Sequence, residues 1–520
     1  MKEEKVGMTP KKILTIAVLS LALAIIIIDS SVLNVSISKL ITDLHTDIKT
    51  IDWVISVYSL VLGALTITGG RLGDLLGRKK MFVLGAIIFA IGSLIASFST
   101  NVNMLLFGWS IIEGIGAALM MPATASLLIA SFKDQERAIA FGIWGGIAGA
   151  SAALGPIIGG YLTTNVSWHW AFRINVFVVI ALVIGSIVIK ESIDRKEKKE
   201  LDILGVLLSS SSLFLLVYGI IESSTYGWIT AKVPYEIFGH TYGLWGYSIV
   251  VFTLVAGLLL MGAFMLWENY VEKKGETPLV SLKLFPNKAF TSGVITTAIM
   301  SLGQTGLIFA VPIFLQAVRH LNSFDTGVAL LPMSLALLVF APLSAVLVKK
   351  ISAKNLVIIG LIITGIASVV LYYSLNVDTT AMTLIPGLFI YGAGMGLVMS
   401  QINNITLSAV DVYQAGEASG VNTTMRQVGA TLGSAIVGAI FLSSFTTTFV
   451  NGINESKVIP EIAKQPIVKV VQDSGSELEF NSVNNNPQLA RNPALANEMV
   501  KLTNESTVKG NMDALLVTTG

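Results

Sequence analysis

The chain has 520 residues, of which 53% are hydrophobic and 13% are charged, about half of the roughly 25% charged residues that soluble domains carry. A mean hydropathy of +0.75 excludes an ordinary soluble protein, because no interior of this size could remove so much apolar surface from water. Cysteine is absent and the four histidines stand singly, so we expect no metal, cofactor or His-based triad. The net charge of +2 says little about partners, and we expect no nucleic-acid partner.

Thirteen apolar runs, each long enough to cross a bilayer core of about 30 Å, follow one another along the chain. They lie at 13–34, 51–70, 81–98, 103–130, 139–162, 170–189, 203–222, 242–267, 290–317, 327–348, 355–375, 380–410 and 419–447. The first run carries Asp29 and is too long for a cleavable signal peptide, so we keep it as the first span. The sequence therefore predicts an all-α, multi-pass membrane protein.

The basic residues predict how these spans are oriented. Alternate short loops hold few of them, namely Lys39, Lys49, Lys232 and Arg319. By contrast, 22 of them gather before residue 14 and in 71–80, 133–137, 190–199, 273–288 and 349–354. The positive-inside rule then places the N-terminus in the cytoplasm and the protein in the cytoplasmic (inner) membrane. The polar stretch 449–512 falls outside, where it could be a folded cap or a disordered segment.

Polar connectors divide the chain into four parts. A dense charge run fills 190–202, and a second connector at 268–289 contains two prolines. The predicted parts are an N-terminal six-helix bundle (1–189), a cytoplasmic connector with an inserted helix pair (190–268), a C-terminal bundle with five visible spans (269–448) and an extracytoplasmic polar segment (449–520). A fourteenth span would begin near Asn511, so we expect the sequence either to be truncated before it or to end outside.

The turn between the second and third spans contains an acid among basic residues. It reads Gly70-Arg71-Leu72-Gly73-Asp74-Leu75-Leu76-Gly77-Arg78-Lys79. Basic residues alone would anchor a cytoplasmic loop, but they leave Asp74 unexplained. An acid here can pair with Arg78 or face a helix N-terminus, in a contact that one conformation makes and another breaks. The predicted switch loop consists of Gly70, Gly73, Asp74, Gly77, Arg78 and Lys79.

This turn resembles the G-x-L-(A/G)-D-x-x-G-R-K pattern of the major facilitator superfamily. Further on, Gly155-Pro156-Ile157-Ile158-Gly159-Gly160, with Gly142 upstream, resembles the helix-five signature of its drug:proton antiporters, although generic small-residue packing would also account for these glycines. Residues 29–35, 168–175, 267–268, 278–285 and 314–316 resemble the fourteen-span branch. The resemblance implies two six-helix bundles plus an inserted helix pair, and multidrug efflux coupled to protons.

The fourth helix departs from the family pattern R-x-x-Q-G-x-G-A-A. Here the residues are Ser110-Ile111-Ile112-Glu113-Gly114-Ile115-Gly116-Ala117-Ala118, so the arginine is missing and the glutamine is an acid. That arginine is associated with proton coupling in the family. The identity of the coupling ion is therefore left open by the sequence.

Ionisable residues inside spans are candidate functional groups, because a charge in hydrocarbon is costly. Glu113 near the midplane and Asp29, with Asn34 close by, could bind a proton or a cation, or could be structural hydrogen-bonding groups. Arg426 resembles a basic position in span thirteen of the branch, where it could contact substrate or hold helices together. Glu268 stands at a span end and is expected to be solvated.

These observations predict a monomeric secondary transporter, not an enzyme, that exports small amphipathic or cationic compounds in exchange for protons by alternating access. Two other readings stay open. One is a carrier or flippase of lipids or other amphiphiles without strict proton coupling, which the lost arginine favours. The other is a membrane receptor or scaffold, which the short cytoplasmic loops disfavour.

Overall fold

The structure, a computed structural model, describes residues 9–46, 48–192, 200–237, 240–242, 245–474 and 493–517. Thirteen of its helices are long and apolar enough to cross a membrane, which confirms the predicted all-α, multi-pass architecture. A two-stranded antiparallel hairpin of β1 (Tyr235–Ile237) and β2 (His240–Tyr242) lies outside these helices. The helices are α1 (Pro10–Asp43), α2 (Ile48–Leu76), α3 (Arg78–Ala96), α4 (Val102–Leu105), the π-helix η1 (Leu106–Glu113), α5 (Gly114–Ser131), α6 (Asp134–Asn165), α7 (His169–Gly185), α8 (Ile203–Tyr226), α9 (Ile249–Lys273), α10 (Lys288–Ala317), α11 (Ser323–Leu347), α12 (Ala353–Ser374), α13 (Ala381–Ser408), α14 (Ala415–Glu455), α15 (Glu461–Ser474) and α16 (Pro493–Val517), and short 3₁₀ turns cover Ser186–Val188, Leu282–Leu284 and Val412–Gln414.

Side-chain caps fix where several spans begin. A helix leaves its first backbone N–H groups without partners, and a polar side chain at the N-cap can accept a hydrogen bond from one of them. Thr9 does this for α1, directly before Pro10, whose ring suits the first helical position. The same role belongs to Asp202 at α8, Ser248 at α9, Asn287 at α10 and Asn322 at α11.

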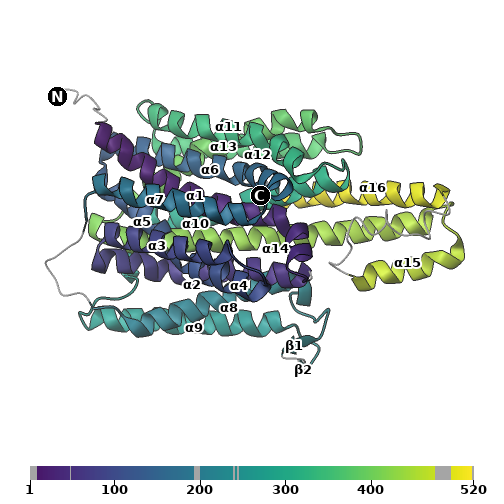
Figure 1. The fold of residues 1–520 in the computed structure, drawn as a ribbon, viewed down its shortest axis with the longest axis horizontal. Coiled ribbons are helices and arrows are strands. Elements are labelled where there is room, and N and C mark those ends of the chain that lie inside the picture. The colour runs from purple at the N-terminus through teal and green to yellow at the C-terminus, as the bar shows by residue number, and fades with distance from the viewer. Residues whose placement is uncertain are drawn as a thin grey trace.

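Two hydrophobic cores organise the helices (Figure 1). The first is built mainly from α1 to α7, around side chains such as Phe82 and Phe141, and the second from α10 to α16, around Phe314 and Tyr391. Across the boundary between them, α6 packs on α11 and α13, and α14 packs on α2 and α5. Helices α8 and α9 form a pair at one edge, where α8 contacts both α2 and α14.

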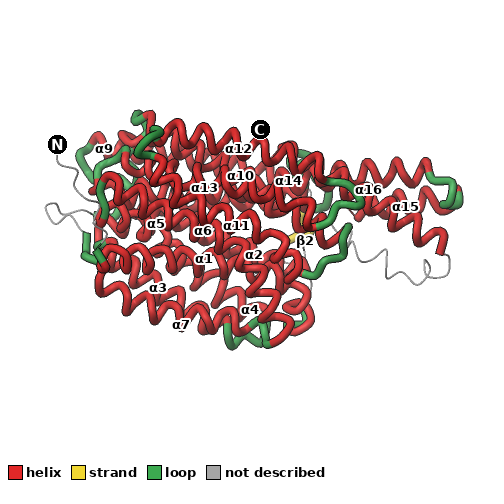
Figure 2. Tube along the Cα trace, turned by 90° about the horizontal axis from the view of Figure 1, so that it is seen from above, coloured by secondary structure: helices red, strands yellow, loops and turns green. Residues whose placement is uncertain are grey.

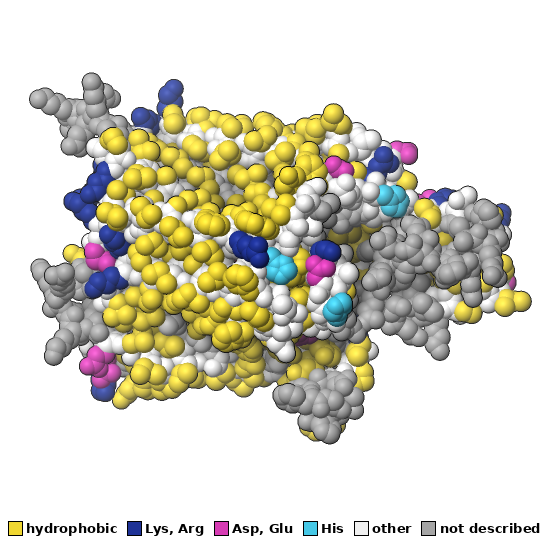
Figure 3. All heavy atoms as spheres, viewed as in Figure 1, with side chains coloured by type: hydrophobic (Ala, Val, Ile, Leu, Met, Phe, Trp, Pro, Cys, Tyr) yellow, Lys and Arg dark blue, Asp and Glu magenta, His cyan; other side chains and the backbone are white. Residues whose placement is uncertain are grey.

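The two ends of the helix bundle differ in charge. Figure 3 shows hydrophobic side chains over the middle of one face, and Lys and Arg together with a few Asp and Glu along its left margin. That margin is the end at which α1 begins and at which the α2–α3, α5–α6 and α11–α12 turns lie. We call it the basic end and define it by the turns that hold Lys79, Lys133 and Lys350.

At the opposite end, α14 continues far beyond the other helices. Its 41 residues extend about 60 Å, twice the thickness of a bilayer core. The rings of Phe441, Phe445 and Phe449 stack along it at 6.1 and 5.5 Å, and α16 packs beside them. Figures 1 and 2 show α14, α15 and α16 projecting together from the bundle. Within the polar stretch 449–512, residues 449–474 and 493–512 are therefore mostly helical. Residues 475–492, and residues 193–199 of the first connector, lie outside the described residues.

Candidate functional site

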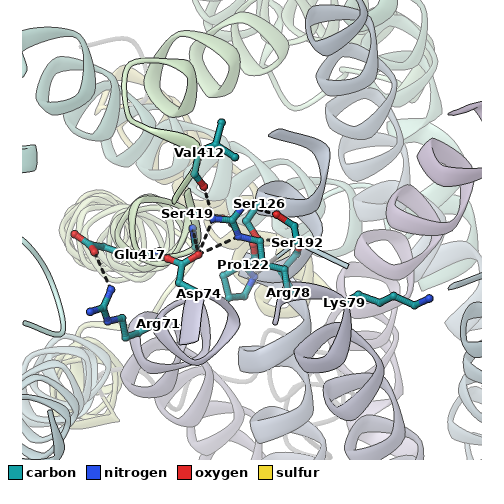
Figure 4. Close-up of polar contacts among 12 residues, drawn as sticks. Arg71, Asp74, Arg78, Lys79, Pro122, Ser126, Ser192, Val412, Glu417 and Ser419 are labelled. Carbon is teal, nitrogen blue, oxygen red and sulfur yellow. Dashed lines mark hydrogen bonds and ion pairs between the residues drawn. The ribbon is translucent and has the colours of Figure 1, made fainter. Parts of the chain in front are cut away.

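Asp74 connects the two bundles at the basic end (Figure 4). Its Oδ1 accepts hydrogen bonds from Arg78 Nη2 at 2.7 Å and from the backbone N–H of Gly416 at 3.0 Å. Its Oδ2 accepts from the N–H of Glu417 at 2.8 Å. Because α14 begins at Ala415, the carboxylate faces the positive end of that helix dipole. The acid that the sequence singled out thus contacts a helix N-terminus 342 residues further along the chain.

An ion pair lies beside this contact. Arg71 Nη1 stands 3.4 Å from Glu417 Oε2, and both side chains are buried. Glu417 Oε1 also accepts from the backbone N–H of Ser281 at 2.7 Å. Arg78 donates in addition to the carbonyl oxygen of Val412. Together Arg71, Asp74, Arg78 and Glu417 form a cluster that we call the basic-end cluster, in which each bundle supplies charge to the other.

The expectation that Glu268 is solvated is wrong. Its side chain has no exposed surface, and its Oε2 accepts from the backbone N–H of Val280 at 3.3 Å. The chain after α9 folds back over the end of that helix, which the sequence did not reveal. One turn along α9, Glu272 Oε1 accepts from the Ser281 hydroxyl at 2.8 Å. The segment 280–281 therefore joins the inserted helix pair to Glu417 and to the basic-end cluster.

The remaining members of the predicted switch loop shape the turn itself. Gly77 has φ +112°, a conformation that suits glycine, and a Cβ there would meet the carboxylate of Glu191 at 2.8 Å. That carboxylate accepts from the backbone N–H of Lys79 at 3.0 Å. Gly70 lies against the backbone of Gly416, where a Cβ would come within 2.3 Å of the carbonyl oxygen. The Lys79 side chain points away from the cluster (Figure 4).

The glycines of the helix-five signature lie on two faces of α6. On one face a Cβ at Gly155 would lie 1.7 Å from Ser31 Oγ, so α1 and α6 approach closely there. On the other face the contacts reach α11 of the second bundle. Gly159 belongs to the first face, Gly142 and Gly160 to the second, and Pro156 lies within the helix between them. The signature therefore lets α6 pack closely within its own bundle and against the other.

Asp29 and Glu113 lie in one buried polar cluster inside the first bundle. The Asn175 side-chain amide donates to Asp29 Oδ1 at 2.6 Å and to Glu113 Oε1 at 3.2 Å. Trp109 Nε1 donates to Asp29 Oδ2 at 2.6 Å. Ser93, on α3, accepts from the same amide at 3.1 Å. We call these five residues the carboxyl cluster; it lies among α1, α3, η1 and α7, and not at the boundary between bundles.

Glu113 owes its position to an irregular helix. It is the last residue of the π-helix Leu106–Glu113. A π-helix is rare in proteins, and where one occurs it is often at a functional site. Within the described residues its Oε2 is buried without a hydrogen-bond partner. Sequence reasoning missed Trp109 and the role of Asn175. Asn175 closes the motif 168–175, and a polar residue in an apolar helix was the signal that could have identified it.

Arg426 occupies a different environment. It lies on α14, and its Nη2 contacts Met121 Sδ of α5 at 3.3 Å, across the boundary between bundles. The structure does not bring it to Asp29 or Glu113. The Asn34 side chain lies outside the described residues.

Comparison with known proteins identifies the family. The sequence profile of the Major Facilitator Superfamily matches residues 19–434. The chain belongs to the Major Facilitator Superfamily. Its all-helical fold agrees with this family, and it is a membrane transporter and not an enzyme.

Several relatives are named for drug resistance. The tetracenomycin C resistance and export protein of Streptomyces glaucescens is 28% identical over 84% of this chain and 77% of its own. The methylenomycin A resistance protein of Bacillus subtilis is 29% identical over 82% of this chain and 87% of its own. The multidrug resistance protein Stp of Mycobacterium tuberculosis is 25% identical over 90% and 83%. Antibiotic resistance and export thus recur among these relatives.

A solved structure shares the fold. The human organic anion transporter MFSD10 (TETRAN) superimposes with a TM-score of 0.56, covering 83% of this chain and 94% of that one. The two sequences are 12% identical, so the likeness concerns the fold alone.

Proposed function

We propose that this transporter exports small amphipathic compounds by alternating access, with residues 1–189 and 269–448 as the two moving bodies. The observation that carries the proposal is the bond of Asp74 to the first backbone N–H groups of α14. A contact of this kind stabilises only the conformation in which the basic end is closed, and it must break when that end opens. The drug-resistance and export names of the relatives support efflux as the direction.

The orientation follows from charge. Lys79, Lys133 and Lys350 lie at the end where the basic-end cluster closes the boundary. The positive-inside rule places that end, and with it the N-terminus, in the cytoplasm. The basic-end cluster is then the cytoplasmic closure, and α15 and the first part of α16 lie outside the cytoplasmic membrane.

The carboxyl cluster is the proposed proton site. Two buried carboxylates that share one amide donor repel each other strongly, so the pair holds at least one proton. Trp109 connects this site to the moving interface, because its ring stacks on Tyr58 of α2 at 4.7 Å. Because the cluster faces α3 and α7, the proton and the substrate would not touch the same side chains. Protonation would instead affect substrate binding by shifting the helices of the first bundle.

A second candidate function is a carrier of lipids or similar amphiphiles. An apolar groove of about 500 Å³ lies between α2 and α8, lined by Val61, Ala64, Leu65, Ser210, Ser211, Phe214 and Leu215. The Phe214 side chain is exposed. A long acyl chain could lie there, which favours this candidate over a receptor.

Transport by the purified full chain in proteoliposomes distinguishes the two functions. We expect uphill movement of water-soluble amphipathic compounds that requires a pH gradient. Movement of a fluorescent phospholipid between leaflets, at a rate that ignores the gradient, would instead support the lipid carrier. Absence of both activities would refute the proposed function.

A further inference from the structure

The side chain of Arg426 is a positive charge at the centre of the molecule. It is the twelfth residue of α14, which places it about 16 Å from the start of that helix and close to the middle of a bilayer core of about 30 Å. Its guanidinium reaches across the boundary between bundles to Met121 of α5. In transporters of this architecture, substrate sites lie near the midplane between the two halves.

Burial along α14 shows where the closed part of this boundary stops. Every residue from Ala415 to Thr424 is buried, beginning at the basic-end cluster. Met425 and Arg426 are the first partly exposed residues beyond that stretch. Arg426 therefore stands at the edge of the closed region, where a compound between the bundles would first meet a charge.

No acid neutralises this guanidinium within the described part of the chain. Among the described residues its polar contact is to the thioether sulfur of Met121, a weak acceptor that carries no charge. Elsewhere in the protein the buried arginines are paired, Arg71 with Glu417 and Arg78 with Asp74. Arg426 is only partly buried, but a charge near the middle of the bilayer is costly unless it is paired, so a group from outside the chain is expected to supply the missing negative charge.

Two further polar atoms close to Arg426 in the sequence have no partner among the described residues. They are Asn422 Oδ1 and Thr424 Oγ1, and their side chains are 5% and 2% exposed. Asn422 precedes Arg426 by four residues and therefore lies on the same face of α14. Its amide nitrogen already donates to Asn403 Oδ1 at 3.0 Å, which leaves the oxygen to accept. This face thus offers a cation and a hydrogen-bond acceptor.

We propose that Arg426 binds the anionic group of the exported compound, so that the substrates are organic anions with an apolar body and a hydroxyl donor. The inference rests on the proposed function and gives its substrate class. It reverses the expectation of cationic substrates, which depended on Asp29 and Glu113. Those two acids face Asn175, inside the first bundle, so they supply no negative charge beside Arg426.

Three probes with one ring system and different charge test the inference. They are 2-naphthoate, 2-naphthylmethanol and 2-naphthylmethylammonium, titrated calorimetrically into the full chain in nanodiscs after subtraction of empty nanodiscs. The parent protein should prefer the anion. Arg426→Gln should weaken naphthoate binding at least about tenfold, the low end for loss of a charge-assisted hydrogen bond, and should not weaken binding of the cation.

Matched variants separate charge from folding. Arg426→Lys keeps the charge and should retain part of the naphthoate affinity, whereas Arg173→Gln removes an arginine that stacks on Phe98 and Trp170 and should change nothing. The inference fails if the parent protein prefers the cation, if it does not bind naphthoate, or if Arg426→Gln binds it as well as the parent. It also fails if chloride stabilises the parent against heat as strongly as naphthoate does.

The same probes keep this failure distinct from failure of the proposed function. Uphill export of the cationic probe by the parent protein would overturn the anion inference while supporting efflux. Naphthoate binding that depends on Arg426, without transport of any probe, would support the site and count against the exporter.

Discussion

Replacement of Asp74 by asparagine should open the basic end. The variant keeps the size of the side chain but has one acceptor oxygen instead of two, and it turns an NH₂ group toward a backbone N–H donor. Asp74 accepts two hydrogen bonds from α14, at 3.0 and 2.8 Å, and its side chain is buried. The bond to Arg78 lies within one bundle, so it stabilises the closed and the open conformation equally. It therefore drops out of the free-energy difference between them.

The magnitude follows from the bonds that cross the boundary. A hydrogen bond to a charged group contributes about 1.5–3 kcal/mol, and the dipole of α14 adds up to about 1 kcal/mol, while water in the open state recovers part of both. A net change of about 2–3 kcal/mol shifts the equilibrium between closed and open forms about 30- to 150-fold.

Cysteine labelling measures this shift, because the chain has no cysteine of its own. Ser419 is buried, and its hydroxyl donates to the carbonyl oxygen of Pro122 across the boundary at 3.0 Å. In a Ser419→Cys background, a membrane-impermeant maleimide added from the basic end should react faster when Asp74→Asn is present. Asp378→Asn, which removes an exposed acid, should leave the rate unchanged. A labelling rate within twofold of the parent would refute the role of Asp74.

Three other changes have defined outcomes. Glu113→Gln should abolish the dependence of uphill export on the pH gradient but spare downhill movement; if both persist unchanged in proteoliposomes, Glu113 is a structural acid. Glu417→Gln should raise the Ser419→Cys labelling rate less than Asp74→Asn does, since its pair with Arg71 is longer at 3.4 Å, and an equal or larger effect would contradict this order. Gly155→Ala should lower the unfolding temperature, because its Cβ would overlap Ser31 and such overpacking costs about 1–3 kcal/mol. Gly365→Ala, which has open space around it, is the control. Equal unfolding temperatures for the two variants would count against the close packing of α1 and α6.

Sequence alone determined the features that depend on local composition. The length of each apolar run is enough to decide whether it can cross a bilayer, and the thirteen predicted spans are the thirteen helices of the structure that can do so. The turn 70–79 was also identifiable, because Asp74 is an acid in a basic loop. Its partner could be expected to be a helix N-terminus, which is what α14 provides.

Tertiary structure decided which way each ionisable side chain faces. A regular helix would place Glu113 on one face, but the π-helix changes the number of residues per turn and rotates it toward Asn175. Glu268 is buried because the chain after α9 folds over it, a contact that no local pattern encodes. Arg71 and Arg426 differ because Arg71 meets the acid Glu417 on another helix, whereas Arg426 meets the sulfur of Met121. Hydrophobic length is a property of a segment, whereas the partner of a charge is a property of the packed bundle.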